Sequence, residues 1–209
     1  FVEEAVKAFN NVKVGMPWEQ DTQMGSQINE KQLEKILKYV EVGKSEGARV
    51  ACGGERITDG ELAKGAFMKP TLLVDVKNDM RVAQEEIFGP VMPVLTFDSI
   101  EEVIRKVNSM AHPLALYIFA QEKAICEKVT SECGFGGGCI NDTIIHLATS
   151  AMPFGGVGES GMGGYHGQKG FETFSHYKSI VDKKTWIDLP MRYQPYRRIY
   201  DKLIHIFLK

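Results

Sequence analysis

The amino-acid sequence predicts an α/β fold: a doubly wound, mostly parallel sheet that is flanked by helices and followed by a C-terminal extended strand. Strand-like and helical patterns alternate through residues 91–141, and strands joined by helices in this order build a parallel sheet through right-handed crossovers. Residues 114–120 form an unbroken apolar run, as expected of a parallel strand covered on both faces. Ligands of such sheets lie beyond the carboxyl ends of the strands.

The chain opens inside a helical pattern. Val2, Ala5, Val6 and Phe9 place apolar side chains at offsets of three and four, and neither an initiator methionine nor an N-cap precedes them. A helix is therefore under way at the first residue, and we expect that further residues precede this segment in the natural protein.

A second helix begins after Asn29, an N-cap residue followed three positions later by Gln32. Gly43 is predicted to end this helix. Residues 49–52 and 70–76 then have the pattern of strands. The apolar stripe of the helix consists of Leu33, Ile36, Leu37 and Val40.

The middle of the chain carries the clearest alternation. Residues 91–97 are strand-like, and Ser99 with Glu102 forms a capping box for the next helix, whose apolar stripe is Ile100, Val103, Ile104 and Val107. The elements that follow are the apolar strand of residues 114–120, a helix over 122–132, a glycine-rich strand over 138–141, a glycine-rich segment over 151–170, extended chain over 171–183, and a helical pattern beyond Pro190.

Composition excludes several classes of function. A net charge of −2 and a pI near 6.3 give no basic surface for nucleic acid, and no apolar run approaches the roughly 20 residues of a membrane span. The cysteines are too few for a secreted disulfide framework and lack metal-ligand spacing, so we expect no metal and a reduced, cytoplasmic protein. They are Cys52, Cys126, Cys133 and Cys139.

Three motifs carry candidate chemistry. In the first, EEIFGP, Glu86 stands two residues before Phe88, and a Gly-Pro pair follows. A carboxylate beside a flat aromatic ring suits a ribose diol next to a nicotinamide ring, although on chemistry alone an acidic turn ahead of a strand is the favoured interpretation. The second motif has a formal GxGxxG at Gly156, Gly158 and Gly161, but no strand precedes it and no helical stripe follows, which argues against a phosphate loop.

The third motif is a glycine-rich strand that ends at Asn141 and Asp142. Its glycines permit tight packing, or its end places one of these polar residues near a pocket. EEIFGP, this strand and the later PFGG-x-x-x-SG-x-G together resemble the aldehyde dehydrogenase superfamily, from Phe1 to about residue 183. Residues 1–107 look like the tetrameric branch, and the chain from Pro113 looks like the dimeric, fatty-aldehyde branch, with the boundary near Asn108.

The resemblance implies a mechanism in which a cysteine thiolate attacks an aldehyde, hydride passes to NAD or NADP, and a glutamate activates water. In this family the nucleophile, the general base and most of the cofactor site precede a segment like this one. We therefore expect this chain to lack both catalytic groups, to be inactive alone, and to leave most cofactor contacts to the missing N-terminal domain. Each of its four cysteines is interpreted as a small core residue.

The resemblance also assigns supporting residues. Glu86 matches the residue that binds the nicotinamide ribose, and Phe88 matches the aromatic that packs against the nicotinamide. Phe154 matches the aromatic of the aldehyde tunnel, and Asn141 and His146 resemble pocket-side positions. For His146 a structural histidine is the favoured interpretation.

Three segments follow from these observations: residues 1–165 as the truncated catalytic domain, 166–186 as the oligomerisation strand, and 187–209 as a basic amphipathic tail. The extended chain at 171–183 resembles the strand that augments a partner's sheet, so we expect a homo-oligomer, more readily a dimer than a tetramer. The tail either docks on a subunit or lies on an anionic membrane surface. Its apolar residues are Tyr196, Ile199, Tyr200, Leu203 and Phe207, and its basic residues are Arg192, Arg197, Arg198, Lys202 and Lys209.

Three hypotheses compete. The first is the C-terminal part of an enzyme that oxidises an aldehyde to a carboxylic acid. The second is a non-catalytic oligomerisation or binding module derived from the family. The third, which depends on the formal GxGxxG, is a stand-alone dinucleotide-binding protein.

Overall fold

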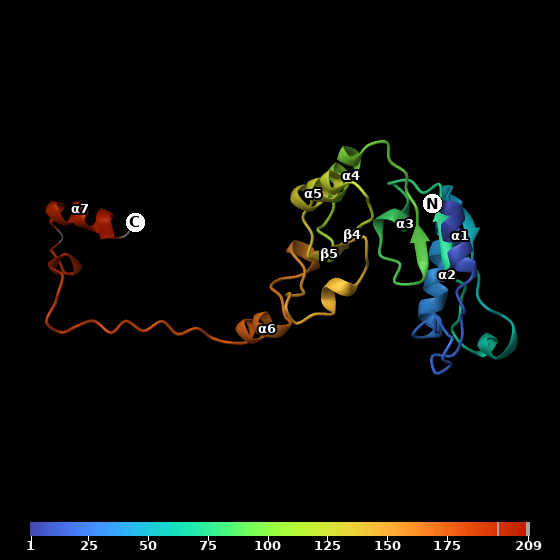
Figure 1. Ribbon diagram of the computed structural model, residues 1–209, viewed down its shortest axis with the longest axis horizontal. Helices are drawn as coiled ribbons and strands as arrows, with labels where there is room; N and C mark the ends of the chain where they lie inside the picture. Colours follow the sequence, from blue (N-terminus) through green and yellow to red (C-terminus); the bar gives the residue numbers. More distant parts are fainter. Residues whose placement is uncertain (196, 208–209) are drawn as a thin grey trace. The chain divides into compact units, whose positions relative to one another are not determined.

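The computed structural model describes residues 1–195 and 197–207 of the chain. These residues form two compact units, Phe1–Ser109 and Met110–Lys209, and each unit has its own sheet (Figure 1). The α/β fold is confirmed, and two pairs of strands are parallel, one in each sheet. Since β3 pairs with β2 and β4 pairs with β5, the predicted run of alternating strands and helices is divided between two sheets.

The first unit has a three-stranded sheet in the order β1-β2-β3. The strands β1 and β2 are antiparallel, and β2 and β3 are parallel. The last two strands are shorter than the sequence predicted. The elements in chain order are α1 (Val2–Asn10), α2 (Glu30–Glu46), β1 (Arg49–Cys52), η1 (Gly60–Lys64), β2 (Thr71–Val74), α3 (Arg81–Gln84), β3 (Val91–Pro93) and α4 (Ile100–Asn108).

Helix α2 begins where the sequence predicted and ends later. The side chain of Asn29 accepts a hydrogen bond of 2.8 Å from the Gln32 amide, which satisfies a donor of the first turn. The prediction that Gly43 ends the helix is wrong: the helix runs to Glu46, and Gly47 terminates it with a φ of 108°. Gly43 lies inside the helix, where an added Cβ would come within 3.4 Å of Leu73 and Val82 side chains.

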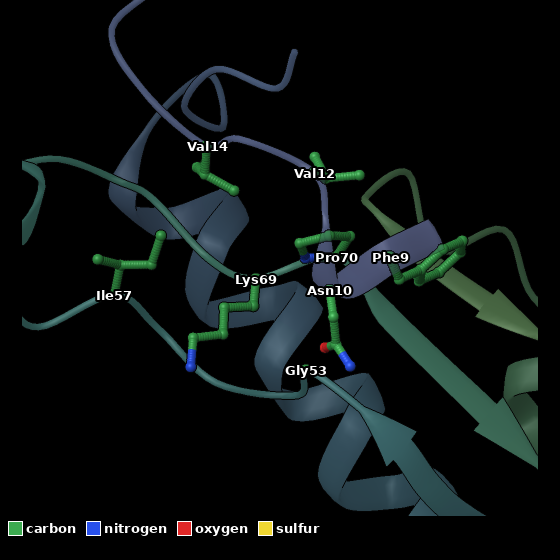
Figure 2. A pocket seen from close by; sticks show the side chains of 8 residues that line it. All are labelled: Phe9, Asn10, Val12, Val14, Gly53, Ile57, Lys69 and Pro70. Atoms are coloured by element: carbon green, nitrogen blue, oxygen red, sulfur yellow. The ribbon is translucent and has the colours of Figure 1, made fainter. Parts of the chain in front are cut away.

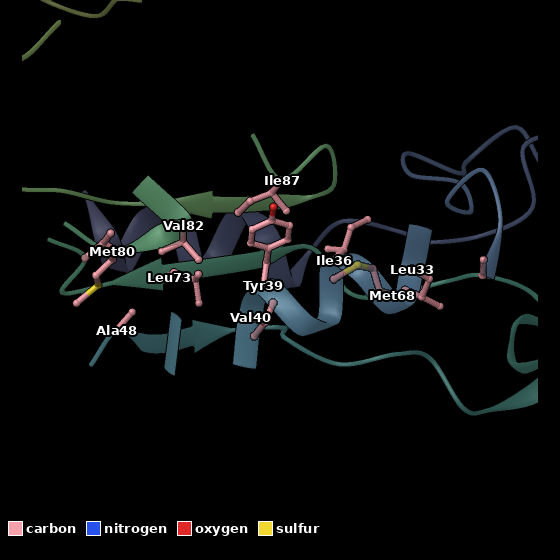
Figure 3. Close-up of a cluster of buried hydrophobic side chains, with 12 residues drawn as sticks. Leu33, Ile36, Tyr39, Val40, Ala48, Met68, Leu73, Met80, Val82 and Ile87 are labelled. Atoms are coloured by element: carbon pink, nitrogen blue, oxygen red, sulfur yellow. The ribbon is translucent and has the colours of Figure 1, made fainter. Parts of the chain in front are cut away.

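The hydrophobic core of the first unit lies between α2, the sheet and α3 (Figure 3). All four residues of β2 are buried, so this central strand is covered on both faces. The core cluster consists of Leu33, Ile36, Tyr39, Val40, Ala48, Ala66, Met68, Leu73, Val76, Met80, Val82 and Ile87.

The second unit contains a β-α-β motif. Strands β4 (Ala115–Ile118) and β5 (Gly137–Ile140) are parallel, and α5 (Lys123–Glu132) connects them. The first strand is less buried than the sequence predicted, because all four residues of β4 are half-buried. Helix α5 contributes the buried side chains Cys126 and Val129 to this unit.

The C-terminal segment departs from the predicted extended strand at its start. Residues 171–173 belong to α6 (Gly167–Thr173), and exposed chain without helix or strand follows over residues 176–184, which is extended (Figure 1). Two short turns of helix, η2 (Ile145–Leu147) and η3 (Gly158–Ser160), precede α6.

The tail contains η4 (Pro190–Arg192) and the predicted helix, α7 (Arg198–Phe207). Tyr196 and Lys209, two residues of the predicted amphipathic tail, lie outside the described residues. Within the helix, Ile199 and Leu203 are exposed, and membrane contact through them stays a prediction. No helix in the described part of the chain is long and apolar enough to cross a bilayer.

Candidate functional site

The EEIFGP turn follows α3, and its first glutamate is held within the fold. The Tyr39 hydroxyl donates a 2.7 Å hydrogen bond to Glu85, and the Arg81 guanidinium donates two of 2.9 Å from the preceding helical turn. Arg81 first, and then Tyr39, lower the pKa of Glu85 from 4.5 to about 2, because hydrogen bonds to the ionised form favour it. Glu85 therefore anchors the turn as a carboxylate.

The next residues alternate between outside and inside. Glu86 is exposed and has no hydrogen bond or ion pair among the described residues. Ile87 is buried in the core, whereas the Phe88 ring is 76% exposed. The Gln32 side chain, at the start of α2, donates a 3.0 Å hydrogen bond to the Phe88 carbonyl and thereby fixes the turn to the helix.

The backbone of Phe88 has a φ of 56°, in the left-handed region. This region is unusual for a bulky residue and costs about 1–3 kcal/mol. Residues on both sides hold this conformation. Ile87 is buried in the core before it, and the backbone of Gly89 after it packs so closely on Ile36 that an added Cβ would lie 2.4 Å from that side chain. The turn thus presents a free carboxylate and an exposed aromatic ring, the two sequence-predicted cofactor residues.

In the second unit, Phe154 lies at the centre of an aromatic cluster. Its backbone pairs with that of Tyr165 through two 2.9 Å hydrogen bonds, and the two rings meet edge to face at 5.7 Å. His166 stacks on Phe154 with a centroid distance of 5.9 Å and an interplanar angle of 22°. Sequence reasoning missed both partners, although the two consecutive aromatic residues before Gly167 were a possible signal.

His146 also belongs to this cluster. Its ring centroid lies 5.9 Å from that of Phe154 and 5.8 Å from that of Tyr117 on β4. Its Nδ1 atom lies 3.6 Å from the Cys139 sulfur. The other ring nitrogen, Nε2, is buried and has no hydrogen-bond partner among the described residues. The structure therefore brings His146 and Phe154 together, and their role beside an aldehyde stays a prediction.

Asn141 has a different environment. It follows β5 with a φ of 57°, which asparagine tolerates better than most residues. Its side-chain oxygen accepts from the Ala120 amide at 2.9 Å, and its nitrogen donates to the Ala120 carbonyl at 3.0 Å. The side chain thus ties together the ends of the two parallel strands, and its pocket-side role stays a prediction.

The formal GxGxxG does not have the structure of a dinucleotide loop. Gly158 has a φ of 62°, and the helix that follows it spans only the three residues Gly158–Ser160. The Ser160 hydroxyl accepts a 3.0 Å hydrogen bond from the Val157 amide, so this amide is satisfied within the loop. A dinucleotide fingerprint needs a preceding strand and a full helix, and this loop has neither beside it.

Other surface features of the first unit include a hollow of about 320 Å³ between the end of α1 and the segment that connects β1 to β2 (Figure 2). Its one charged lining residue, Lys69, is paired with Glu55 at 2.7 Å. None of the sequence-predicted site residues lines it. The described residues also contain no group of three or more His, Cys, Asp or Glu that could hold a metal ion.

The chain matches the family model described as "Aldehyde dehydrogenase family" over residues 1–180. It is 40% identical to a probable coniferyl aldehyde dehydrogenase from Pseudomonas aeruginosa over 178 residues, 85% of this chain and 36% of that protein. It is 42% identical to the dimeric NADP-preferring aldehyde dehydrogenase of Canis lupus familiaris over 173 residues, 82% of this chain and 36% of that protein.

Solved structures agree with these sequence relatives. The NAD⁺ complex of an aldehyde dehydrogenase from Bacillus cereus has a TM-score of 0.79 and 42% identity, covering 88% of this chain and 36% of that one. This chain thus spans little more than a third of the length of each of these three relatives. The chain belongs to the aldehyde dehydrogenase family.

Proposed function

We propose that this chain is the C-terminal part of an NAD(P)-dependent aldehyde dehydrogenase that oxidises an aldehyde to a carboxylic acid. The observation that carries the proposal is the EEIFGP turn, which exposes the unpartnered Glu86 and holds Phe88 in a strained conformation. Strain of this kind persists where the surrounding structure imposes it and often marks a ligand-contacting site.

The residues of this turn fit a nicotinamide nucleotide. The Glu86 carboxylate, free of protein partners, would accept hydrogen bonds from two ribose hydroxyls, and the Phe88 ring would bury its exposed face against the nicotinamide. The bound cofactor would supply the hydride acceptor. Related proteins are described as an NAD⁺ complex and as NADP-preferring, so we propose NAD or NADP, held mainly by residues outside this chain.

On the substrate side, Phe154 with the neighbouring His146 would form an apolar, aromatic wall against the aldehyde, and Asn141 would support it through β5. We further propose a cytoplasmic homo-oligomer, most readily a dimer. The exposed extended chain over residues 176–184 (Figure 1) supports strand exchange, and four free cysteines are compatible with a reducing compartment.

The nucleophile and the general base would come from residues outside this chain. Cys126 and Cys133 are buried, and desolvation raises the pKa of the Cys133 thiol, which opposes formation of a thiolate. Neither of these cysteines is available to an aldehyde. Cys52 and Cys139 are half-buried, but the general base and most of the cofactor site would lie outside this chain. The isolated chain would therefore be inactive.

Two assays test this proposal. First, the purified chain is incubated with an aldehyde and NAD or NADP, and we expect no reduced cofactor; sustained turnover would contradict the assignment. Second, the chain replaces the matching C-terminal part of the Bacillus cereus enzyme. Aldehyde-dependent cofactor reduction by this chimera supports the enzyme, and a folded chimera without activity favours the non-catalytic module.

The chimera also tests the cofactor residues. Glu86→Gln removes the charge that would accept from the ribose and should raise the KM for the cofactor by about tenfold, since a hydrogen bond to a charged group contributes about 1.5–3 kcal/mol. The matched control is Glu61→Gln, an exposed carboxylate on η1, which should leave the KM unchanged. Equal KM values for the two variants would remove Glu86 from the cofactor site.

A further inference from the structure

Cys139 forms a thiol–imidazole pair with His146 that the proposed oxidation does not use. The two residues come from β5 and η2, with 3.6 Å between the sulfur and Nδ1. Both line a hollow of about 500 Å³ in the second unit. Cys139 is half-buried, as is Cys52 in the first unit. Cys52, however, has no hydrogen-bond partner for its thiol among the described residues.

The hollow has the chemistry to admit a small, neutral, mostly apolar molecule. Asp142 is the one acidic residue that lines this hollow. Its carboxylate accepts a 2.7 Å hydrogen bond from the Thr143 amide. This negative charge disfavours an anionic reagent. The apolar lining residues are Ile140, Ile145, Ala148 and Met152.

The imidazole is placed to relay a proton from the thiol. Its Nε2 atom is buried without a hydrogen-bond partner in the described part of the chain. In the neutral tautomer with hydrogen on Nε2, Nδ1 is free to accept the thiol hydrogen. Aromatic rings are weak acceptors for such an N–H, and Tyr117 and Phe154 surround the imidazole.

We propose that Cys139 is a covalent modification site for small, neutral, conjugated carbonyl compounds, with His146 as the proton relay. The sulfur forms a bond to the β-carbon of the reagent, and the electron pair of the carbon–carbon double bond moves toward the carbonyl. The thiol proton passes to Nδ1 and then to the α-carbon. Nothing leaves and nothing is oxidised, so the adduct carries the full mass of the reagent.

Conjugated carbonyls fit this pair better than saturated aldehydes. A thiol adds to a saturated aldehyde reversibly, whereas conjugate addition leaves a stable carbon–sulfur bond. The reaction needs a proton acceptor beside the thiol and a donor to the α-carbon, and one imidazole meets both needs in sequence. This site would act whether or not the chain contributes to a dehydrogenase.

The first test uses the purified chain with acrolein, a small conjugated aldehyde, and follows adducts by peptide mass spectrometry. Cys52 is an internal reference in the same molecule, because it is similarly half-buried but lacks a histidine partner. We expect Cys139 to react about tenfold faster than Cys52, which is less than the roughly 100-fold or more that an optimally placed base supplies. Equal rates, or faster reaction at Cys52, would overturn the proposal.

The second test removes the relay with His146→Asn, which keeps a polar side chain of similar size. The rate at Cys139 should fall to that at Cys52, while the rate at Cys52 stays unchanged. The buried Cys126 and Cys133 report on folding, since they remain unmodified only in a closed structure. An unchanged rate at Cys139 in a variant whose buried cysteines stay unmodified would refute the relay.

A third arm separates conjugate addition from reversible addition. Propanal, a saturated aldehyde, should leave no stable adduct on Cys139 under conditions in which acrolein does. A persistent propanal adduct on this residue would contradict the proposed bond to the β-carbon. Failure of these tests would leave the proposed dehydrogenase function intact, because the chimera assay does not depend on Cys139.

Discussion

Adjacent residues of one turn have opposite roles. Glu85 is bound by Tyr39 and Arg81 and stabilises the fold, whereas Glu86 has no partner among the described residues and faces outward. The Phe88 ring also faces outward, and its backbone is strained because φ lies in the left-handed region. The residues that stabilise the turn are therefore distinct from those that it offers to a ligand, and mutations should separate the two.

Glu85 should make stability depend on pH. Its pKa falls from 4.5 to about 2 in the folded state, so its contribution is present above pH 4.5 and is lost as the pH falls through 2. Wild type should be more stable than Glu85→Gln near neutrality, and this difference should shrink across that window. Urea unfolding at a series of pH values measures it; a constant difference would contradict the role of this carboxylate. Glu86→Gln, the control, should change the unfolding free energy by less than about 0.5 kcal/mol.

Phe88→Gly should stabilise the isolated chain slightly. Glycine removes a left-handed penalty of about 1–2 kcal/mol and adds a loss of about 0.5–1 kcal/mol from backbone entropy, while the exposed ring contributes little to packing. We expect a net gain of roughly 0.5 kcal/mol by urea unfolding. Phe88→Ala, which keeps the Cβ and the strain, should show no gain. A destabilisation above about 1 kcal/mol for the glycine variant would mean that the ring packs within the fold.

The cofactor role of Glu86 and Phe88 was predictable from the sequence only through the family resemblance. Chemistry alone favoured an ordinary acidic turn, because a carboxylate and an aromatic are common neighbours. The partners of Glu85 were not predictable, since Tyr39 lies 46 positions away in the chain. Likewise, no local pattern indicated that Cys139 and His146 would meet, because their contact depends on how η2 folds back on β5.

At the scale of secondary-structure elements, caps and close packing determine where helices begin and end. The start of α2 was predictable because Asn29 caps it locally. Its end was not, because Gly43 is a packing residue against Leu73 and Val82, and only tertiary structure distinguishes this role from a stop. Similarly, α6 extends into the predicted strand at Phe171, since local helix formation at 167–173 overrides the extended pattern there.

The cap of α2 should be measurable by substitution. Asn29→Ala removes the acceptor of the Gln32 amide and should lower the unfolding free energy by about 1 kcal/mol. Asn29→Asp retains an acceptor at the helix N-terminus and should keep most of the wild-type stability. Thermal or urea unfolding compares the three proteins. An alanine variant as stable as wild type would show that the hydrogen bond contributes nothing net.

At the scale of the whole molecule, several large exposed apolar residues lie in the C-terminal chain. Tyr177, Ile180, Val181 and Trp186 are each at least 72% exposed, and the chain over residues 176–184 is extended (Figure 1). An extended segment with free backbone groups pairs readily with a sheet edge. This is the structural basis for expecting strand exchange between copies.

Strand exchange predicts a specific dependence of oligomeric state on backbone hydrogen bonding. Val181→Pro removes a backbone donor and should convert a dimer to a monomer, whereas Val181→Thr keeps the donor and a strand-forming side chain and should remain dimeric. Light scattering after size-exclusion chromatography measures the mass of each. If both variants and a form ending at residue 174 have the same subunit number as wild type, residues 176–184 do not mediate assembly.

The division of the chain after Ser109 coincides with a position where genetic recombination would leave the strand pairing intact. From the sequence motifs we expect the resemblance to change from one branch of the family to another near Asn108, beside this division. Among the described residues, each sheet is completed within its own unit, and the main core cluster belongs wholly to the first. Genetic recombination at this position would therefore exchange whole blocks of paired strands without separating any described strand from its neighbour, so a change of branch at this division would leave the strand pairing of both parts intact.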